Sequence, residues 1–153
     1  MRSQTPIPQG KYRPALRNGN AIYTAGMTPR RNGVLVMTGQ VGPDTPLETL
    51  APAVAQAAQN ALAAAQGALE AGERLLGLLS LTVYVNAPAG FQGHSRVADL
   101  ASQWFYEQLG EGGICPRTAV GVSSLPGDAP VELQTIFPVS YTHLRAHETL
   151  RHL

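Results

Sequence analysis

The residue best suited to bind a small ligand is an arginine at the start of a segment whose side chains alternate between two faces, as in a β-strand. Arg117 opens the segment 117–125 and shares one of its faces with the small residues Ala119 and Gly121. The small side chains leave space in front of this face, and a guanidinium beside such a space can bind a carboxylate through two parallel hydrogen bonds. The pattern alone still favours an ordinary structural role, either a solvated edge arginine or an ion pair.

Other polar residues carry weaker chemical signals. Cys115 is the only cysteine, so no intrachain disulfide can form, and no base near it in sequence points to a nucleophile. Tyr84 and Asn86 are interpreted as interface or turn residues. Glu132 is interpreted as a solvated or ion-paired surface acid.

The hydrophobic periodicity predicts one α+β domain. The predicted elements are strands over 21–26 and 34–37, a helix over about 52–71, a strand over 79–86, a helix over 94–109, and strands over 117–125 and 131–139. This order, β-β-α-β-α-β-β, predicts two helices packed on one face of a mixed sheet.

Turn and capping signals set the limits of these elements. Asn32-Gly33 predicts a tight turn that joins the first two strands into a hairpin. The first helix begins either at a capping box over 45–48 or near Pro52, and Gly72 is predicted to end it.

The strand faces also make a prediction about the site. If Val122 lies opposite Leu133 on the core face, Gly121 lies opposite Gln134 on the other face. Arg117 and Gln134 would then share one face of the sheet.

Composition excludes several classes of protein. The chain has 153 residues, 44% of them hydrophobic, which suits a single domain with a real core. A net charge of +1 gives no electrostatic reason to expect binding to nucleic acid or to a membrane surface. No signal peptide or membrane span is recognised, and a single cysteine fits a reducing compartment, so a cytoplasmic protein is expected.

The C-terminal segment breaks the pattern of the rest. We assign residues 1–140 to the domain and interpret 141–153 as a non-native or disordered tail, in preference to a short C-terminal helix. His143 and His147 are spaced as metal ligands on a helix would be, but no further ligand accompanies them, and no metal site is predicted.

Several motifs occur together, in order, over about residues 5–139. They are Cys-Pro-Arg-Thr-Ala-Val-Gly-Val-Ser-Ser-Leu-Pro at 115–126, Val-Glu-Leu-Gln at 131–134, Gly-Lys-Tyr at 10–12 and Tyr-Thr-Ala-Gly-Met-Thr-Pro at 23–29. Together they resemble the RidA/YjgF family of imine deaminases, also labelled endoribonuclease L-PSP. A longer first loop and Thr-Gly-Gln-Val-Gly at 38–42 resemble a divergent branch of that family.

This resemblance implies a chorismate-mutase-like (YjgF-like) fold and a homotrimer with sites between subunits. In the family an arginine holds the carboxylate of a 2-imino acid, water attacks the imine carbon, and a 2-oxo acid and ammonia are released. The activity protects enzymes that such imines damage. No cofactor is implied, because a protonated imine is already electrophilic.

The site residues are carried over by position. Arg117 matches the carboxylate anchor, Tyr12 the site tyrosine, and Gly26 the glycine whose backbone lies beside the ligand. Asp99 falls near a helix asparagine of the family site.

Three positions depart from the family. Gln134 stands where a second glutamate helps to activate water, and a glutamine can orient water but cannot accept its proton. Ala25 replaces a site serine and Ala119 replaces a site cysteine.

Three functions remain open, because the carboxylate anchor Arg117 is retained while the residue that activates water is changed to Gln134. They are a deaminase of small 2-imino acids, a non-catalytic binder of small 2-oxo or 2-imino carboxylates, and, with less support, an endoribonuclease. His94 is the only histidine outside the tail, which argues against the last.

Overall fold

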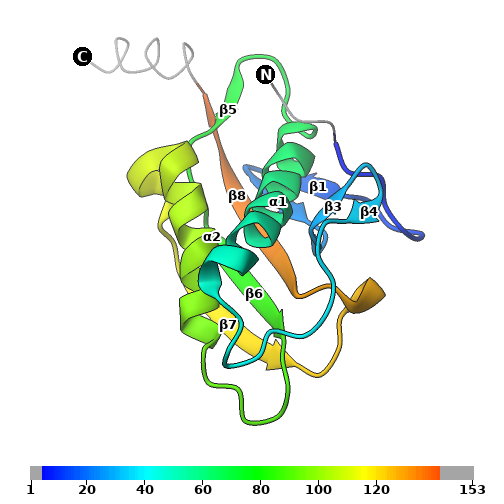
Figure 1. Ribbon diagram of the computed structural model, residues 1–153. Helices are drawn as coiled ribbons and strands as arrows, with labels where there is room; N and C mark the ends of the chain where they lie inside the picture. The colour runs from blue at the N-terminus through cyan, green and yellow to red at the C-terminus, as the bar shows by residue number, and fades with distance from the viewer. Residues whose placement is uncertain (1–4, 142–153) are drawn as a thin grey trace.

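The structure is a computed structural model that describes residues 5–141 (Figure 1). Its elements are β1 (Ala15–Asn18), β2 (Ala21–Thr24), β3 (Arg30–Arg31), β4 (Val34–Leu35), α1 (Leu47–Gln66), β5 (Glu73–Leu75), β6 (Ser80–Asn86), α2 (His94–Leu109), the short 3-10 helices η1 (Gly110–Gly113) and η2 (Pro126–Asp128), β7 (Arg117–Val122) and β8 (Val131–Tyr141). The expectations for His143, His147 and the rest of the tail beyond Tyr141 lie outside the described residues.

A mixed sheet forms the centre of the fold, in the order β1-β2-β8-β6-β7, with β5 on a further part of β8. Only the β6–β7 pair is parallel, and α2 connects these two strands. Helices α1 and α2 lie side by side over one face of the sheet (Figure 1). The predicted α+β class with two helices on one face of a mixed sheet is therefore confirmed.

The core fills the space between the two layers. Alternate residues of β6 and β8 face the helices and are fully or almost fully buried; they are Leu81, Val83, Val85, Val131, Leu133, Thr135, Phe137 and Val139. The helices present small residues to this face, and Phe105 of α2 packs edge-on against Phe137 at 6.1 Å. Alanine at most of the α1 contacts lets that helix lie close to the sheet.

The first helix differs from the prediction at both ends. It begins at Leu47 with Pro46 as its N-cap, and Pro52 lies inside it. The Thr45 hydroxyl accepts a hydrogen bond from the Gly42 N–H at 2.9 Å, so the predicted capping box is not formed. The helix ends at Gln66, and Gly72 instead takes a positive φ of 83° in the turn before β5.

The predicted first hairpin was wrong in its partners. Asn32 and Gly33 do form the tight turn, with φ of 54° and 82°, but they join the short strands β3 and β4. β2 pairs instead with β1, across a turn at Gly19. Asn18-Gly19 carried the same turn signal, but β1 has no hydrophobic alternation to mark it as a strand.

The predicted register of the last two strands was also wrong. β6 lies between β7 and β8, so these strands do not form a hairpin. Arg117 pairs with the buried Leu81 and faces the helices, whereas Gln134 pairs with Thr82 on the opposite face. Val122 is consequently not on the core face, and Arg117 and Gln134 of one chain lie on opposite sides of the sheet.

An ion pair joins β5 to the hairpin formed by β1 and β2. The Arg17 guanidinium donates to the Glu73 carboxylate and, at 3.4 Å, to the Tyr141 hydroxyl. The Arg17 hydrogen bond, together with that from the Glu70 N–H, lowers the pKa of Glu73 to about 2.

We expect Glu73→Gln to destabilise the protein at neutral pH but not in strong acid. A lowered carboxylate pKa stabilises the fold above the unfolded pKa of about 4.5, and this contribution is lost as the pH falls towards 2. Urea unfolding of both proteins between pH 7 and pH 2.5 measures it. A stability difference that does not shrink on acidification would contradict the assignment.

Candidate functional site

Arg117 is held by one face of helix α2. Its Nη1 donates to Asp99 Oδ1 at 2.8 Å and to Ser102 Oγ at 3.0 Å, and its Nη2 donates to Ser95 Oγ at 3.0 Å. Residues 95, 99 and 102 have the i, i+4, i+7 spacing that puts them on one helix face. The structure thus brings Asp99, one of the predicted site residues, to the predicted anchor.

The space predicted in front of Ala119 and Gly121 is occupied. A side chain at Gly121 would meet His94 Nε2 at 2.6 Å, and Ala119 packs against the hydrophobic core. The small residues make room for α2, not for a ligand. Burial raises the pKa of the neighbouring Cys115 thiol and the charge of Arg117 only partly offsets this, so a thiolate nucleophile is disfavoured there.

Tyr12 and Gly26 line a different feature, a cavity of about 710 Å³. Its walls come from the N-terminal segment, the chain after β2, the β3–β4 hairpin and α1; the lining residues include Tyr12, Gly26, Thr28, Arg30, Arg31, Gln56 and Asn60. The Tyr12 hydroxyl accepts a hydrogen bond from the Gln9 N–H at 3.1 Å, which fixes the ring at the cavity wall.

Glu132 lies directly against Gly26. Met27 and Leu133 exchange backbone hydrogen bonds of 2.7 and 2.9 Å, and this holds the chain after β2 onto β8. A Cβ atom at Gly26 would come within 2.1 Å of Glu132 Oε2, so the carboxylate occupies the volume that a side chain would need. A side chain at position 26 would therefore displace the Glu132 carboxylate from its place.

Glu132 is not the solvated or ion-paired acid that the sequence suggested. The side chain is half-buried, and no hydrogen bond or ion pair of its carboxylate is found within residues 5–141. Burial raises the pKa of Glu132 above the usual range of a glutamate. A half-buried carboxylate whose pKa is raised, packed on a residue that lines the cavity, is better suited to accept a proton than an ordinary exposed glutamate.

Gln134 lies on the same face of β8 as Glu132 but is exposed. Two residues along a strand place the Cα atoms about 7 Å apart. The two polar residues of the Val-Glu-Leu-Gln motif therefore border the same open face of the sheet.

The two groups of predicted residues are separate within one chain. β7, which carries Arg117, lies two strand spacings from β8, or about 10 Å across the sheet. Arg117 also faces the helices, whereas Glu132 faces away from them. One protomer alone does not combine Arg117 with Tyr12, Gly26 and Gln134.

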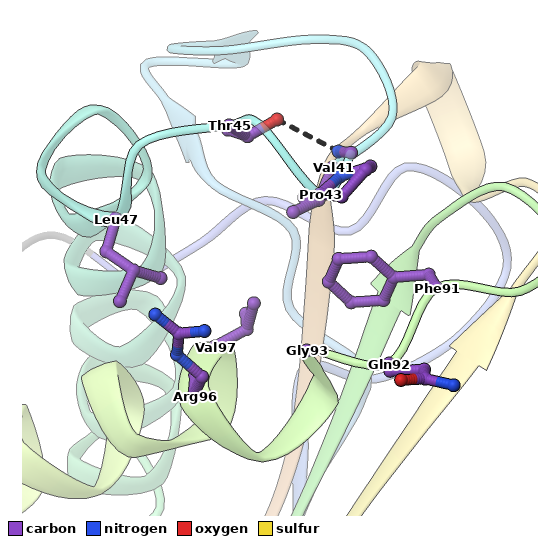
Figure 2. Close-up of a pocket in the computed structure, with 10 residues that line it drawn as sticks. Val41, Pro43, Thr45, Leu47, Phe91, Gln92, Gly93, Arg96 and Val97 are labelled. Carbon is purple, nitrogen blue, oxygen red and sulfur yellow. Dashed lines mark hydrogen bonds between the residues drawn. The ribbon is translucent and has the colours of Figure 1, made fainter.

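A second cavity, of about 350 Å³, lies between the start of α1 and the start of α2 (Figure 2). Its walls combine apolar residues, among them Val41, Leu47, Phe91 and Val97, with polar ones, and Arg96 is the one charged residue that lines it within residues 5–141. The hydrogen bond from Gly42 to Thr45 closes one side (Figure 2). None of the site residues predicted from the sequence borders it.

Neither a metal cluster nor a membrane helix is found in the described part of the chain. Within residues 5–141, no group of three or more His, Cys, Asp or Glu side chains is placed to hold a metal ion. No helix in that range is long and apolar enough to cross a membrane.

Comparison with known proteins assigns the family. The sequence model of the family described as Endoribonuclease L-PSP matches residues 2–138. The chain belongs to this family. The RidA/YjgF resemblance carried by the sequence motifs is thereby confirmed.

Individual proteins are similar to this Endoribonuclease L-PSP family member in sequence or in structure. Protein TCP17 of Trypanosoma cruzi is 30% identical over 130 residues, covering 84% of this chain and 81% of TCP17. The protein Atu1372 of Agrobacterium tumefaciens has a solved structure that is 30% identical, with a TM-score of 0.76 over 90% of this chain and 87% of its own. The YjgF gene product of E. coli shares the fold, with 22% identity and a TM-score of 0.64 over 88% of this chain and 92% of its own.

Sequence reasoning on this L-PSP family protein missed two features of the site. The Ser95, Asp99 and Ser102 spacing was a readable signal, because i, i+4 and i+7 polar residues on a helix can hold one guanidinium. Glu132 had no such signal, since its burial depends on Gly26, which lies more than a hundred residues earlier in the chain.

Proposed function

We propose that this protein hydrolyses small 2-imino acids to 2-oxo acids and ammonia, with Glu132 as the group that activates water. The observation that carries this is the unpaired, half-buried Glu132 carboxylate packed on Gly26, a residue that lines the large cavity. In the reaction water adds its oxygen to the imine carbon and gives a proton to Glu132. Starting from the protonated imine, this gives a carbinolamine. Glu132 returns the proton to the carbinolamine nitrogen, ammonia leaves, and the hydroxyl proton passes to Glu132 as the carbonyl forms.

The carboxylate of the substrate needs a cation, and Arg117 is our candidate. Since one chain keeps Arg117 away from Glu132, we propose that Arg117 reaches the cavity of a neighbouring subunit in a homotrimer. β7 supports this, because it is an edge strand of the sheet and Arg117 retains 22% exposure of its side chain.

The remaining predicted residues take supporting roles in this proposal. Tyr12 and the Gly26 backbone border the bound acid, and Gln134 orients water beside Glu132. Ala119, which packs against the core, has no direct role in this proposal. No cofactor is required by this chemistry.

One observation favours a second candidate, a non-catalytic carboxylate binder. Gln134, on the same face of β8 as Glu132, can orient water but cannot accept a proton from it. Endoribonuclease chemistry has less support. His94 is the only histidine within residues 5–141, and it packs edge-on against Phe91 at 5.1 Å with Gly121 beneath it.

Ammonia release decides between these functions. 2-Aminoacrylate is generated in place by a pyridoxal-phosphate dehydratase, with and without this protein, and ammonia is followed. We expect faster release, which Arg117→Ala abolishes. If the wild-type protein gives no acceleration while 2-oxo acids raise its melting temperature, the protein is a binder.

Asp99→Asn should strengthen carboxylate binding. The asparagine keeps the size of the side chain but removes the charge that competes for Arg117. An exposed ion pair is worth about 0.2–1 kcal/mol, so we expect KM for the imino acid to fall by up to about five-fold. Steady-state kinetics measure this, and an unchanged or higher KM would show that Asp99 positions Arg117 instead of competing with the substrate.

A further inference from the structure

The large cavity continues beyond Tyr12 and Gly26 to the β3–β4 hairpin. Its volume of about 710 Å³ is in the range of pockets that hold ligands much larger than a three-carbon acid. Arg30 and Arg31 of the hairpin contribute to its lining, and none of its lining residues carries a carboxylate. The cavity therefore has an uncompensated positive charge in its wall.

A buried amide network fixes this part of the wall. Gln56 and Asn60 of α1 are only 8% and 9% exposed. Gln56 Nε2 donates to Asn60 Oδ1 at 3.0 Å. Asn60 Nδ2 in turn donates to the carbonyls of Thr28 and Arg30 at 3.1 and 2.8 Å, which anchors the hairpin strand on the helix.

The same network orients Arg31. Its Nε donates to Gln56 Oε1 at 3.0 Å, and its two terminal nitrogens have no hydrogen-bond partner within residues 5–141. The side chain of Arg30 bonds within the β3–β4 hairpin instead. Its Nη1 donates to the Gly33 carbonyl at 2.9 Å. Within residues 5–141 neither arginine has an acidic partner among the ion pairs.

A guanidinium that is fixed through Nε, lines a cavity and has no acidic partner within residues 5–141 is arranged to receive an anion. Holding the side chain in place beforehand reduces the entropy that binding would otherwise cost. Its two terminal nitrogens match the two oxygens of a carboxylate.

We propose that Arg31 binds a second carboxylate of the substrate, so that the preferred substrates are imines of dicarboxylic amino acids. This inference rests on the proposed deaminase function for the reaction, but not for the binding. The 2-carboxylate goes to Arg117, the imine carbon to Glu132, and the distal carboxylate to Arg31.

Product binding tests the inference without requiring turnover. Calorimetry compares 2-oxoglutarate with 2-oxopentanoate, which has the same chain length and lacks the distal carboxylate. We expect 2-oxoglutarate to bind at least about ten-fold more tightly to the wild-type protein. Arg31→Gln should remove this preference and leave 2-oxopentanoate binding unchanged.

A matched control is Arg74→Gln, because Arg74 is an exposed arginine on β5 outside the cavity lining. It should keep the full preference for 2-oxoglutarate. Equal affinities for the two acids in the wild-type protein would overturn the inference, as would a preference that survives Arg31→Gln.

Kinetics separate this inference from the proposed function. The imines of glutamate and of norvaline, made by amino-acid oxidases, are compared as substrates. Hydrolysis of both at equal kcat/KM would reject the role of Arg31 and keep the deaminase. Selective binding of 2-oxoglutarate that depends on Arg31, without hydrolysis of either imine, would reject the deaminase and keep the role of Arg31.

Discussion

Glu132→Gln should abolish imine hydrolysis and at the same time make the folded protein more stable at neutral pH. Glutamine fills the same space on Gly26 and can hold water, but it cannot take a proton. Loss of a general base costs a factor of about 10² to 10⁴ in rate. We expect kcat to fall by that amount while KM changes little, as measured with 2-aminoacrylate.

The stability gain follows from the raised pKa of Glu132. A carboxyl whose pKa is higher in the folded than in the unfolded state stabilises the fold only while it is protonated, and this contribution is lost as the pH rises through the folded pKa. Above that pKa the charged, half-buried group therefore opposes folding. The melting temperature of Glu132→Gln should be higher than that of the wild-type protein at pH 7, and the difference should disappear near pH 4.

Two further variants test whether activity depends on the position of the Glu132 carboxylate as well as on its charge. Gly26→Ala places a methyl group where the carboxylate lies, and because a flexible side-chain end can move, we expect a folded protein with lowered kcat. Glu107→Gln changes an exposed acid on α2 and should alter neither property. Full activity of Glu132→Gln would transfer water activation to Gln134 or to another group.

The acid limb of the pH profile of kcat/KM also tests whether Glu132 is the general base. Glu132 must be ionised to accept a proton, so kcat/KM should fall as the pH drops through its raised pKa. In Glu132→Gln the residual rate should lose this limb. A wild-type rate that stays constant down to pH 4 would argue against Glu132 as the base.

Periodicity in the sequence was enough to predict the layers of this fold. The alternation in 79–86 and the helical spacing in 94–109 each reflect burial of one face against the other layer, and both elements were found almost as expected. The ends of α1 were less predictable, because Thr45 bonds to Gly42 and not to the helix. Local signals such as capping boxes are overruled when a neighbouring turn offers the same hydrogen bond.

Strand order was the information that the sequence lacked. Alternation tells which residues of β7 share a face, but not which strand lies beside β7. The insertion of β6 between β7 and β8 moved Arg117 to the helix side and left Gln134 on the other side. The family motifs predicted a set of site residues, but they could not show that these residues fall into two separate groups in one chain.

The separation of Arg117 from Glu132 within one chain leads to the second large effect that we expect. Arg117→Ala and Glu132→Gln should each be inactive alone, and co-expression of the two variants should restore activity. If each site takes Arg117 from one subunit and Glu132 from its neighbour, random assembly of equal amounts leaves about one site in four with both residues intact. We therefore expect about a quarter of the wild-type kcat per chain, in oligomers whose mixed composition is confirmed by native mass spectrometry.

The matched control for this experiment uses a double variant. Co-expression of Arg117→Ala with Arg117→Ala/Glu132→Gln produces mixed oligomers in which no site can contain Arg117, so no activity should return. Mixed oligomers of the two single variants that remain inactive would show that Arg117 and Glu132 do not meet across a subunit boundary. Because sheet topology already keeps the two residues about 10 Å apart across the strands and on opposite faces within one chain, that result would remove Arg117 from the site and leave Arg31 as its anion-binding residue.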